Sequence, residues 1–291
     1  MTTLPLLPLR APSLLAPIAG LGAVLLVDIL TRPLDPVLRM TAVVICGLAV
    51  VKILVLLRTR PQLTQGAAVA FALWPGMDPT PFEHPRPIPQ AQVLARVRDA
   101  FGWLLLGGCL VAVLHLGAAA LPPMLVGLVA LVAASLVLHF GLLGLVTALL
   151  WHRGHPVQPL FDRPLLAHSL SEFWGRRWNR AFSDMLRILL VRPLRGRLPR
   201  PVLVALGFFL SGVLHEAALS LPVLDGWGGP LVYFALHAGL VLFEQHRKPD
   251  WLQGPLGRLW TLTWLVAPLP LLFHPPFIGR VLLPLLGLEP L

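Results

Sequence analysis

A histidine and a glutamate stand next to each other inside a long apolar run. The run extends from Val202 to Leu221, its centre reads FFLSGVLHEAALSL, and His215 and Glu216 lie well inside it. Ser211 precedes His215 by one helical turn and shares its face. Ionisable groups at membrane depth are costly and usually mark function. One buried histidine alone is more often bonded to a neighbouring helix, but the adjacent glutamate and serine favour a functional site.

Several kinds of chemistry can be weighed for these residues. A His-Glu pair can open the zinc-protease motif HExxH, but the second histidine of that motif would occupy the position of Leu219. Ser211 would need a strained turn to act as a nucleophile, and in a helix its hydroxyl is expected to bond to a backbone carbonyl. His152 and His155 form a lone HxxH pair, too few ligands for a di-iron site. Metal-free general acid–base chemistry by His215 remains.

A second candidate segment is polar and reads SLSEFWGRRWNRAFSDMLRILLVR, from Ser169 to Arg192. Ser169 with Glu172 three residues later forms a capping box, which predicts a helix from about Leu170. On one continuous helix, an aromatic and aliphatic stripe would lie beside a basic face, as in helices of the lipid headgroup plane. The stripe comprises Trp174, Trp178, Phe182, Met185 and Leu189, and the basic face Arg176, Arg180 and Arg187.

Small polar residues recur every four positions in this segment, at Gly175, Asn179 and Ser183. Glycine costs about 1 kcal/mol in a helix interior, and asparagine is a poor choice for a position facing lipid. The strip therefore predicts room for a ligand chain, with the amide of Asn179 placed to hydrogen-bond it.

The composition defines the environment in which these residues work. Of 291 residues, 56% are apolar and 12% are charged, and the mean hydropathy is +0.79. Soluble domains carry about 25% charged residues, so a cytosolic enzyme, a disordered chain and a nucleic-acid-binding domain are excluded. Cys46 and Cys109 lie in apolar runs and cannot form a disulfide scaffold or a zinc site. The sequence predicts an all-α, polytopic integral membrane protein.

A transmembrane span requires about 20 apolar residues, and the apolar runs of this length predict about eight transmembrane helices. Together with the amphipathic helix, which we expect in the cytoplasm, they form one membrane domain over residues 1–291. The expected spans are Leu14–Leu30, Met40–Leu57, Phe101–Leu121, Met124–Leu150, Val202–Leu221, Leu231–Glu244, Leu259–Phe273 and a short Phe277–Leu288. We expect Gln65–Trp74 to lie at the interface or to dip into the membrane.

Basic residues orient these spans. The loop from Trp151 to Arg200 holds ten arginines, whereas Pro122–Pro123 and Pro222–Gly229 hold none. The positive-inside rule then places residues 151–200 in the cytoplasm. Only Arg32 and Arg39 lie on the opposite side. The net charge of +10 is expected to serve orientation and contact with anionic lipids.

Two stretches in this order resemble a known family. FWGRRWN, from Phe173 to Asn179, and the membrane-embedded SGxxHE of Ser211–Glu216 are similar to motifs of the membrane-bound O-acyltransferases, in the branch of wax synthases and related bacterial proteins. WPGMDPTPF, from Trp74 to Phe82, is similar to a segment that precedes the catalytic part in that branch. The resemblance covers about 74–244, leaving anchor spans over 14–57 and C-terminal spans over 259–288.

The resemblance implies transfer of a fatty acyl group from acyl-CoA to a hydroxyl within the bilayer, most simply to a long-chain alcohol, giving a wax ester. It implies acyl-CoA as co-substrate, with no other cofactor, no metal and no nucleic-acid partner, and a bacterial cell membrane as the location. His215 and Asn179 map onto the catalytic positions, with His215 as the base. The expected substrate-binding residues are Trp174, Arg176, Arg177, Trp178, Ser211 and Glu216.

An alternative stays open. The chain is shorter than most members of that superfamily and carries Gly-Arg-Arg between the aromatic residues of its motif. A non-catalytic polytopic protein, either a transporter or a lipid-binding scaffold, could keep the same fold. The presence of both Asn179 and His215 favours the enzyme.

Overall fold

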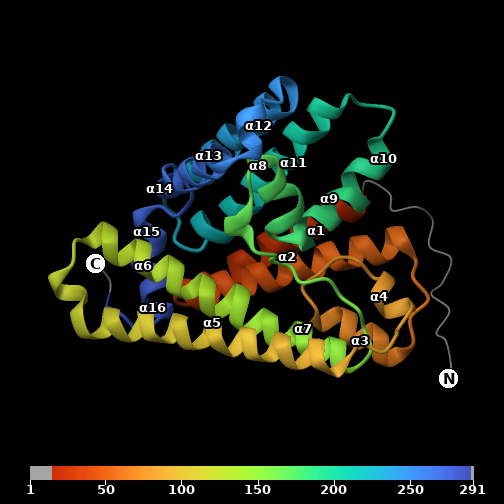
Figure 1. The fold of residues 1–291 in the computed structure, drawn as a ribbon, viewed down its shortest axis with the longest axis horizontal. Helices are drawn as coiled ribbons and strands as arrows, with labels where there is room; N and C mark the ends of the chain where they lie inside the picture. The colour runs from red at the N-terminus through yellow and green to blue at the C-terminus, as the bar shows by residue number, and fades with distance from the viewer. Residues whose placement is uncertain (1–14, 290–291) are drawn as a thin grey trace.

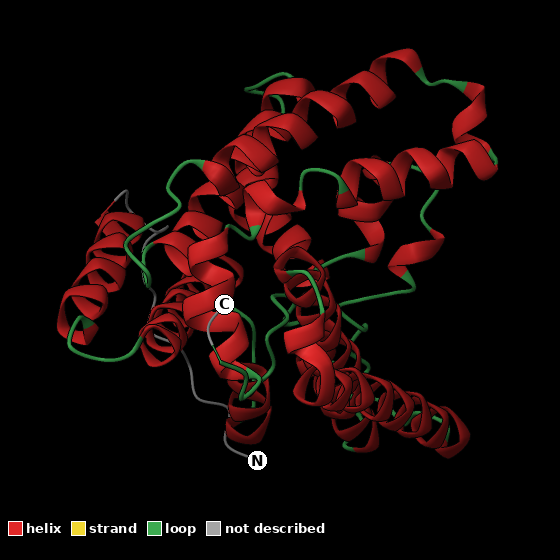
Figure 2. Ribbon diagram, turned by 90° about the vertical axis from the view of Figure 1, so that its left-hand side faces the viewer, coloured by secondary structure: helices red, strands yellow, loops and turns green. Residues whose placement is uncertain are grey.

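The computed structural model describes residues 15–289, and this part of the chain forms helices and no strands (Figure 2). The first residue of the expected span Leu14–Leu30 lies outside the described residues. The longer helices are α1 (Leu15–Thr31), α2 (Pro36–Thr59), α3 (Gln65–Leu73), α5 (Gln90–Gly117), α6 (Pro123–Ser135), α7 (Leu143–His152), α11 (Arg200–His215), α12 (Gly229–Arg247) and α13 (Pro255–Val266).

Short helices complete the described part of the chain, and five of those within residues 15–289 are π-helices, which often mark functional sites. The π-helices are η2 (Leu136–Leu142), η4 (Phe173–Arg177), η5 (Arg187–Val191), η6 (Glu216–Ser220) and η8 (Ile278–Leu282). The other short elements are α4 (Thr80–Glu83), η1 (Ala118–Ala120), η3 (Pro164–Leu166), α8 (Leu170–Glu172), α9 (Arg180–Leu186), α10 (Arg192–Leu194), η7 (Asp250–Gln253), α14 (Leu269–Leu272), α15 (Pro275–Phe277) and α16 (Leu283–Leu285).

The helices form two packed groups joined by α2. In Figure 1, α5 runs beside α6 and α7 along one edge of the molecule, while α11, α12 and α13 gather at the other edge. Helix α2 lies between them and contacts η5, η6 and η8, and α1 packs along it.

The prediction of an all-helical membrane protein is confirmed, but the count of eight spans is not. Within residues 15–289, four helical runs are long and apolar enough to cross a membrane: Pro36–Thr59, Gln90–Ala120, Pro123–His152 and Arg200–Ser220. The two expected C-terminal spans form a pair bent by 73°, which makes a fifth crossing if the pair counts as one. The apolar part of α1 covers only Ala16–Thr31, and α12 ends in polar residues.

The segment Trp74–Phe82 folds back against α2 and α3. The ammonium of Lys52, buried on α2, donates to the carbonyl oxygen of Gly76 at 2.8 Å and lies 3.7 Å from the ring centroid of Phe71. A Cβ at Gly76 would lie 2.1 Å from the indole nitrogen of Trp74, so only glycine fits there. One face of α3, with Ala67 and Phe71, is buried against this segment.

A buried ion pair joins α1 and α2. Arg39 donates to the Asp28 carboxylate through Nε at 2.8 Å and through Nη2, and its Nη1 donates to the carbonyl oxygen of Pro222 at 3.2 Å. From the sequence, Arg39 is expected on the opposite side from most other basic residues. Its pairing with Asp28 and with the carbonyl oxygen of Pro222 accounts for an arginine at this position. Arg32 also faces Asp28, at 3.9 Å, but its side chain is 59% exposed.

This arrangement predicts unequal effects for two arginine substitutions. Arg39→Ala should lower the free energy of unfolding by about 3–5 kcal/mol, because Asp28 is left as a buried unpaired charge. Arg32→Ala should cost only about 0–1 kcal/mol, as for other exposed pairs. Unfolding of both variants in the same detergent tests this expectation, and equal losses would contradict it.

Candidate active site

His215 occupies the last residue of α11, where the helix passes into the π-helix η6. Its Nδ1 lies 2.7 Å from the carbonyl oxygen of Ser211. Because a carbonyl oxygen only accepts, Nδ1 must carry the hydrogen in the neutral ring, and Nε2 is left with a lone pair. The backbone of Ser211 thus fixes the tautomer that can accept a proton at Nε2.

Close packing of α11 against α12 determines what His215 faces. A Cβ at Gly212 would lie 3.1 Å from the Cα of Leu231, so the glycine of SGxxHE allows the two helices to approach. The His215 ring then lies against the buried ring of Phe234, with centroids 4.5 Å apart. His215 itself is half-buried, whereas the side chain of Ser211 is buried.

Glu216 points to a different partner from that of His215. Its Oε1 accepts hydrogen bonds from the backbone amides of Gly228 at 2.8 Å and Leu231 at 3.3 Å, at the start of α12. Its buried Oε2 has no hydrogen-bond partner among the described residues. Glu216 therefore holds α12, which carries Phe234, against the end of α11.

The continuous helix expected over the tryptophan-rich segment is wrong, although its start is confirmed. Ser169 Oγ accepts from the amide of Glu172 at 3.0 Å, as the capping box predicts. The chain then forms the single turn of α8, continues as η4 and breaks at Trp178 and Asn179. Asn179 has a left-handed backbone (φ 45°, ψ 62°), and its Oδ1 accepts from the amide of Phe182 at 3.2 Å.

The break removes the predicted strip of small residues and gives its members other roles. Asn179 caps α9, with its Oδ1 occupied and its amide nitrogen Nδ2 left as a potential donor. Ser183 donates to the carbonyl oxygen of Trp174 at 3.1 Å and so ties α9 back to η4. A single amphipathic helix in the headgroup plane does not form, because helix propensity is a weak term that tertiary contacts override.

Aromatic contacts connect this segment to His215. Trp174 lies 5.6 Å from Phe234, the ring that also contacts His215. Trp178 stacks on Phe173 at 5.4 Å and faces Phe161 at 4.8 Å. The structure thus connects Trp174 to His215 through Phe234, whereas Trp178 packs against Phe161 and Phe173.

The two predicted phosphate-binding arginines differ in their surroundings. Arg177 is half-buried and pairs with Glu172 at 2.7 Å, and it also donates to the carbonyl oxygens of Asp162 and Arg163. Burial alone would raise the pKa of the Glu172 carboxyl, but hydrogen bonds from the His168 amide and Arg177 lower it below its ordinary value. Arg176 is exposed. The side chain of Arg177 is engaged in the fold, and Arg176 faces outward.

Two further ionisable residues near the site were missed in the sequence. His237 is fully buried on α12, with Nδ1 at 2.9 Å from the carbonyl oxygen of Tyr233 and its ring 5.4 Å from Trp174. Glu244, two turns further along α12, is also buried. The rule that singled out His215, an ionisable group inside an apolar span, applies equally to His237. Within residues 15–289, no three His, Cys, Asp or Glu side chains form a group that could hold a metal ion.

The region that holds these residues is similar in sequence to known proteins. The family described as "Membrane bound O-acyl transferase family" matches residues 157–236, which include Trp174, Asn179, His215 and Phe234. This region belongs to the membrane-bound O-acyltransferase family. The predicted resemblance is confirmed, and the apolar helices together with this family make the chain an integral membrane protein.

Relatives of this membrane-bound O-acyltransferase region are acyltransferases by name. A long-chain-alcohol O-fatty-acyltransferase of Simmondsia chinensis is 39% identical over 71 residues, covering 22% of this chain and 20% of the relative. A probable long-chain-alcohol O-fatty-acyltransferase 9 of Arabidopsis thaliana is 40% identical over 73 residues, covering 22% and 21%. Acyl-CoA–sterol O-acyltransferase 1 of Arabidopsis thaliana is 39% identical over 67 residues, covering 21% and 19%. The alignments thus span about a fifth of each relative.

The helix cap and the left-handed backbone at Asn179 predict different stabilities for two substitutions. Asn179→Ala should lower the free energy of unfolding by about 1–2 kcal/mol through loss of the cap and by about 1–2 kcal/mol more through the left-handed backbone. Asn179→Asp should stay close to wild type in stability, because aspartate caps helices and tolerates this backbone. Thermal unfolding in detergent separates the two, and equal stabilities would contradict the structural role.

Proposed function

We propose that this chain transfers a fatty acyl group from acyl-CoA to the hydroxyl of a lipophilic acceptor, with a long-chain alcohol as the acceptor and a wax ester as the product. The observation that carries the proposal is the hydrogen bond between Nδ1 of His215 and the Ser211 carbonyl, which leaves a lone pair on Nε2. His215 lies in the region that matches the O-acyltransferase family. The names of two of the three relatives described above support the alcohol as acceptor.

The proposed reaction is a direct transfer. Nε2 of His215 takes the proton of the alcohol as its oxygen attacks the thioester carbonyl, and a C–O bond forms. The tetrahedral intermediate collapses with cleavage of the C–S bond, and the CoA sulfur takes the proton from Nε2. The products are an ester and free CoA, and His215 returns to its starting form. Apolar surroundings favour this chemistry, because they keep the imidazole neutral and exclude water as a competing nucleophile.

Other residues serve binding in this proposal. Nδ2 of Asn179 is the group that could donate to the thioester or to the developing oxyanion, since Oδ1 already accepts from Phe182. Trp174 would line the path of the acyl chain beside Phe234, and Trp178 would line it further away. Arg176, which is exposed, is the better candidate for CoA phosphates. We assign no substrate contact to three of the expected binding residues, because their contacts position other parts of the protein. These residues are Arg177, Ser211 and Glu216.

The proposed setting is a bacterial cell membrane with residues 151–200 in the cytoplasm, where acyl-CoA is available. The ten arginines of this loop support that orientation. We propose acyl-CoA as co-substrate, with no metal, no further cofactor and no nucleic-acid partner.

Replacement of the proposed base gives the direct test. His215→Gln should lower ester formation by about 10²–10⁴-fold, the usual contribution of general acid–base catalysis, at unchanged expression. Ester formation is measured in membranes supplied with acyl-CoA and long-chain alcohol, sterol or diacylglycerol. Lipid mass spectrometry of a wax-free host fed with long-chain alcohols identifies the product.

His115→Gln is a matched control, because His115 on α5 also places Nδ1 near a carbonyl oxygen four residues earlier, that of Val111 at 2.9 Å. This variant should keep wild-type turnover. Unchanged turnover in His215→Gln would overturn the proposed role of His215. A wild-type protein that consumes no acyl-CoA with any acceptor would favour the transporter or scaffold.

A further inference from the structure

Glu244 is a buried carboxylate that holds three donors from two other parts of the chain. It lies near the end of α12, and its side chain accepts from the backbone amides of Leu170 and Ser171, both at 2.8 Å, and from Nε1 of Trp260 at 3.0 Å. All three partners are donors, which suits a group acting only as an acceptor. Such charge-assisted hydrogen bonds are among the strongest in proteins.

The two amides belong to the start of the tryptophan-rich segment. Leu170 and Ser171 open α8, which continues through η4 to Trp174 and on to Asn179. Backbone hydrogen bonds secure the other end of the segment, from Asp162 to the carbonyl of Arg177 at 2.8 Å and from Arg180 to the carbonyl of Leu160 at 3.0 Å. The segment is therefore fixed at both ends, and at its start Glu244 provides the hydrogen bonds to α12.

The same helix also touches the proposed base. Phe234 contacts His215, and Glu244 follows Phe234 by ten residues on α12, or about 15 Å at 1.5 Å per residue. One helix thus contacts His215 at one point and holds the segment of Trp174 and Asn179 at another. The distance between His215 and the segment that carries Trp174 and Asn179 therefore depends on both contacts.

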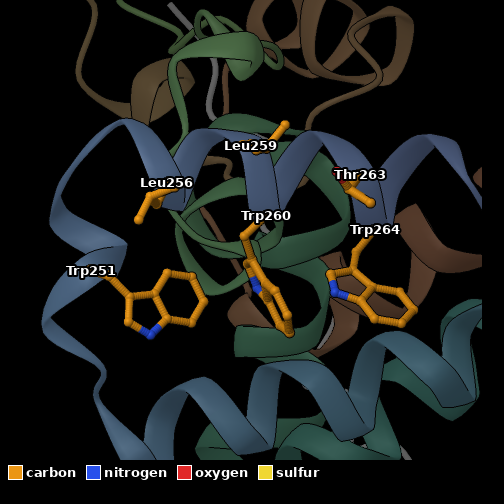
Figure 3. A pocket seen from close by; sticks show the side chains of 6 residues that line it. All are labelled: Trp251, Leu256, Leu259, Trp260, Thr263 and Trp264. Atoms are coloured by element: carbon orange, nitrogen blue, oxygen red, sulfur yellow. The ribbon is translucent and has the colours of Figure 1, made fainter.

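The third donor connects Glu244 to a groove along α13, on the side where Trp260 faces α12. Figure 3 shows Trp251, Trp260 and Trp264 along this groove of about 430 Å³, with the indole of Trp260 between the other two. The Trp260 ring lies 5.3 Å from Trp251 and 5.6 Å from Trp264. Its Nε1 donates to Glu244, so the Glu244 carboxylate accepts hydrogen bonds both from the groove wall and from the tryptophan-rich segment.

We propose that Glu244 is a positioning residue of the acyl transfer: it sets the place of Trp174 and Asn179 relative to His215 without touching either substrate. This inference rests on the proposed function. Glu244→Gln keeps the size of the side chain but replaces one acceptor oxygen with an NH2 group, which would face donors. The segment is then expected to loosen at Leu170 and Ser171.

The test compares Glu244→Gln with Glu83→Gln in the full-length protein in detergent. Glu83 is a matched control, because it accepts a single backbone amide, that of Gln62 at 2.9 Å, which does not belong to the segment. Kinetics with acyl-CoA and long-chain alcohol are combined with hydrogen exchange of the peptide covering residues 168–179. Glu244→Gln should lower kcat by up to about 100-fold, as a displacement near 1 Å can, with KM for acyl-CoA little changed and faster exchange in this peptide.

The control should match wild type in both measurements. Unchanged kcat in a folded Glu244→Gln protein, or unchanged exchange of residues 168–179, would overturn the positioning role. If Glu244→Gln does not fold, Trp260→Phe decides, because it removes one donor and keeps an aromatic ring. A lower kcat with faster exchange in the segment supports the proposal, and no change in either overturns it.

Failure of the proposed function gives a different result. A wild-type protein without acyl transfer to any acceptor overturns the proposed function, and a catalytic role for Glu244 with it. Exchange of residues 168–179 still shows in that case whether Glu244 holds the segment.

Discussion

Polar groups inside an apolar helical bundle have no water to bind, so each one must find a partner within the protein or remain costly. Here, side chains satisfy backbone atoms at the points where helices end or approach one another. Lys52 and Arg39 donate to loop carbonyls, and Glu216 and Glu244 accept from helix-start amides. The arrangement of the candidate site follows from these contacts.

Helix α12 is the frame on which that arrangement is built. Glu216 holds its first turn, Phe234 in its middle contacts both His215 and Trp174, and Glu244 near its end holds the tryptophan-rich segment. The missing side chain at Gly212 lets α11 approach closely enough for the first two contacts. Elements far apart in the chain meet at one helix, which has a rigid backbone and therefore fixes their distances.

Asn179 has a structural role at the break before α9, and the proposed function adds a chemical role. Its Oδ1 and its left-handed backbone start α9, and its Nδ2 is the group proposed to donate to the substrate. The two ring nitrogens of His215 differ in the same way: Nδ1 is bound to the Ser211 carbonyl, and Nε2 is proposed to accept a proton. In each case the internal hydrogen bond fixes the orientation of the group that is proposed to react, which is the preorganisation that catalysis in an apolar site requires.

The sequence by itself determined the membrane class, the helical fold and the capping box at Ser169, because composition, periodicity and capping are local properties. It also singled out His215 as a candidate, because the cost of a buried charge is local as well. The family resemblance also followed from short motifs. Tertiary structure alone decided the partners of Glu216 and Glu244, which lie 12 and 74 residues away, the pairing of Arg39 with Asp28, and the break at Asn179. Such contacts depend on which helices pack together, and packing overrides the weak local preference for one continuous helix.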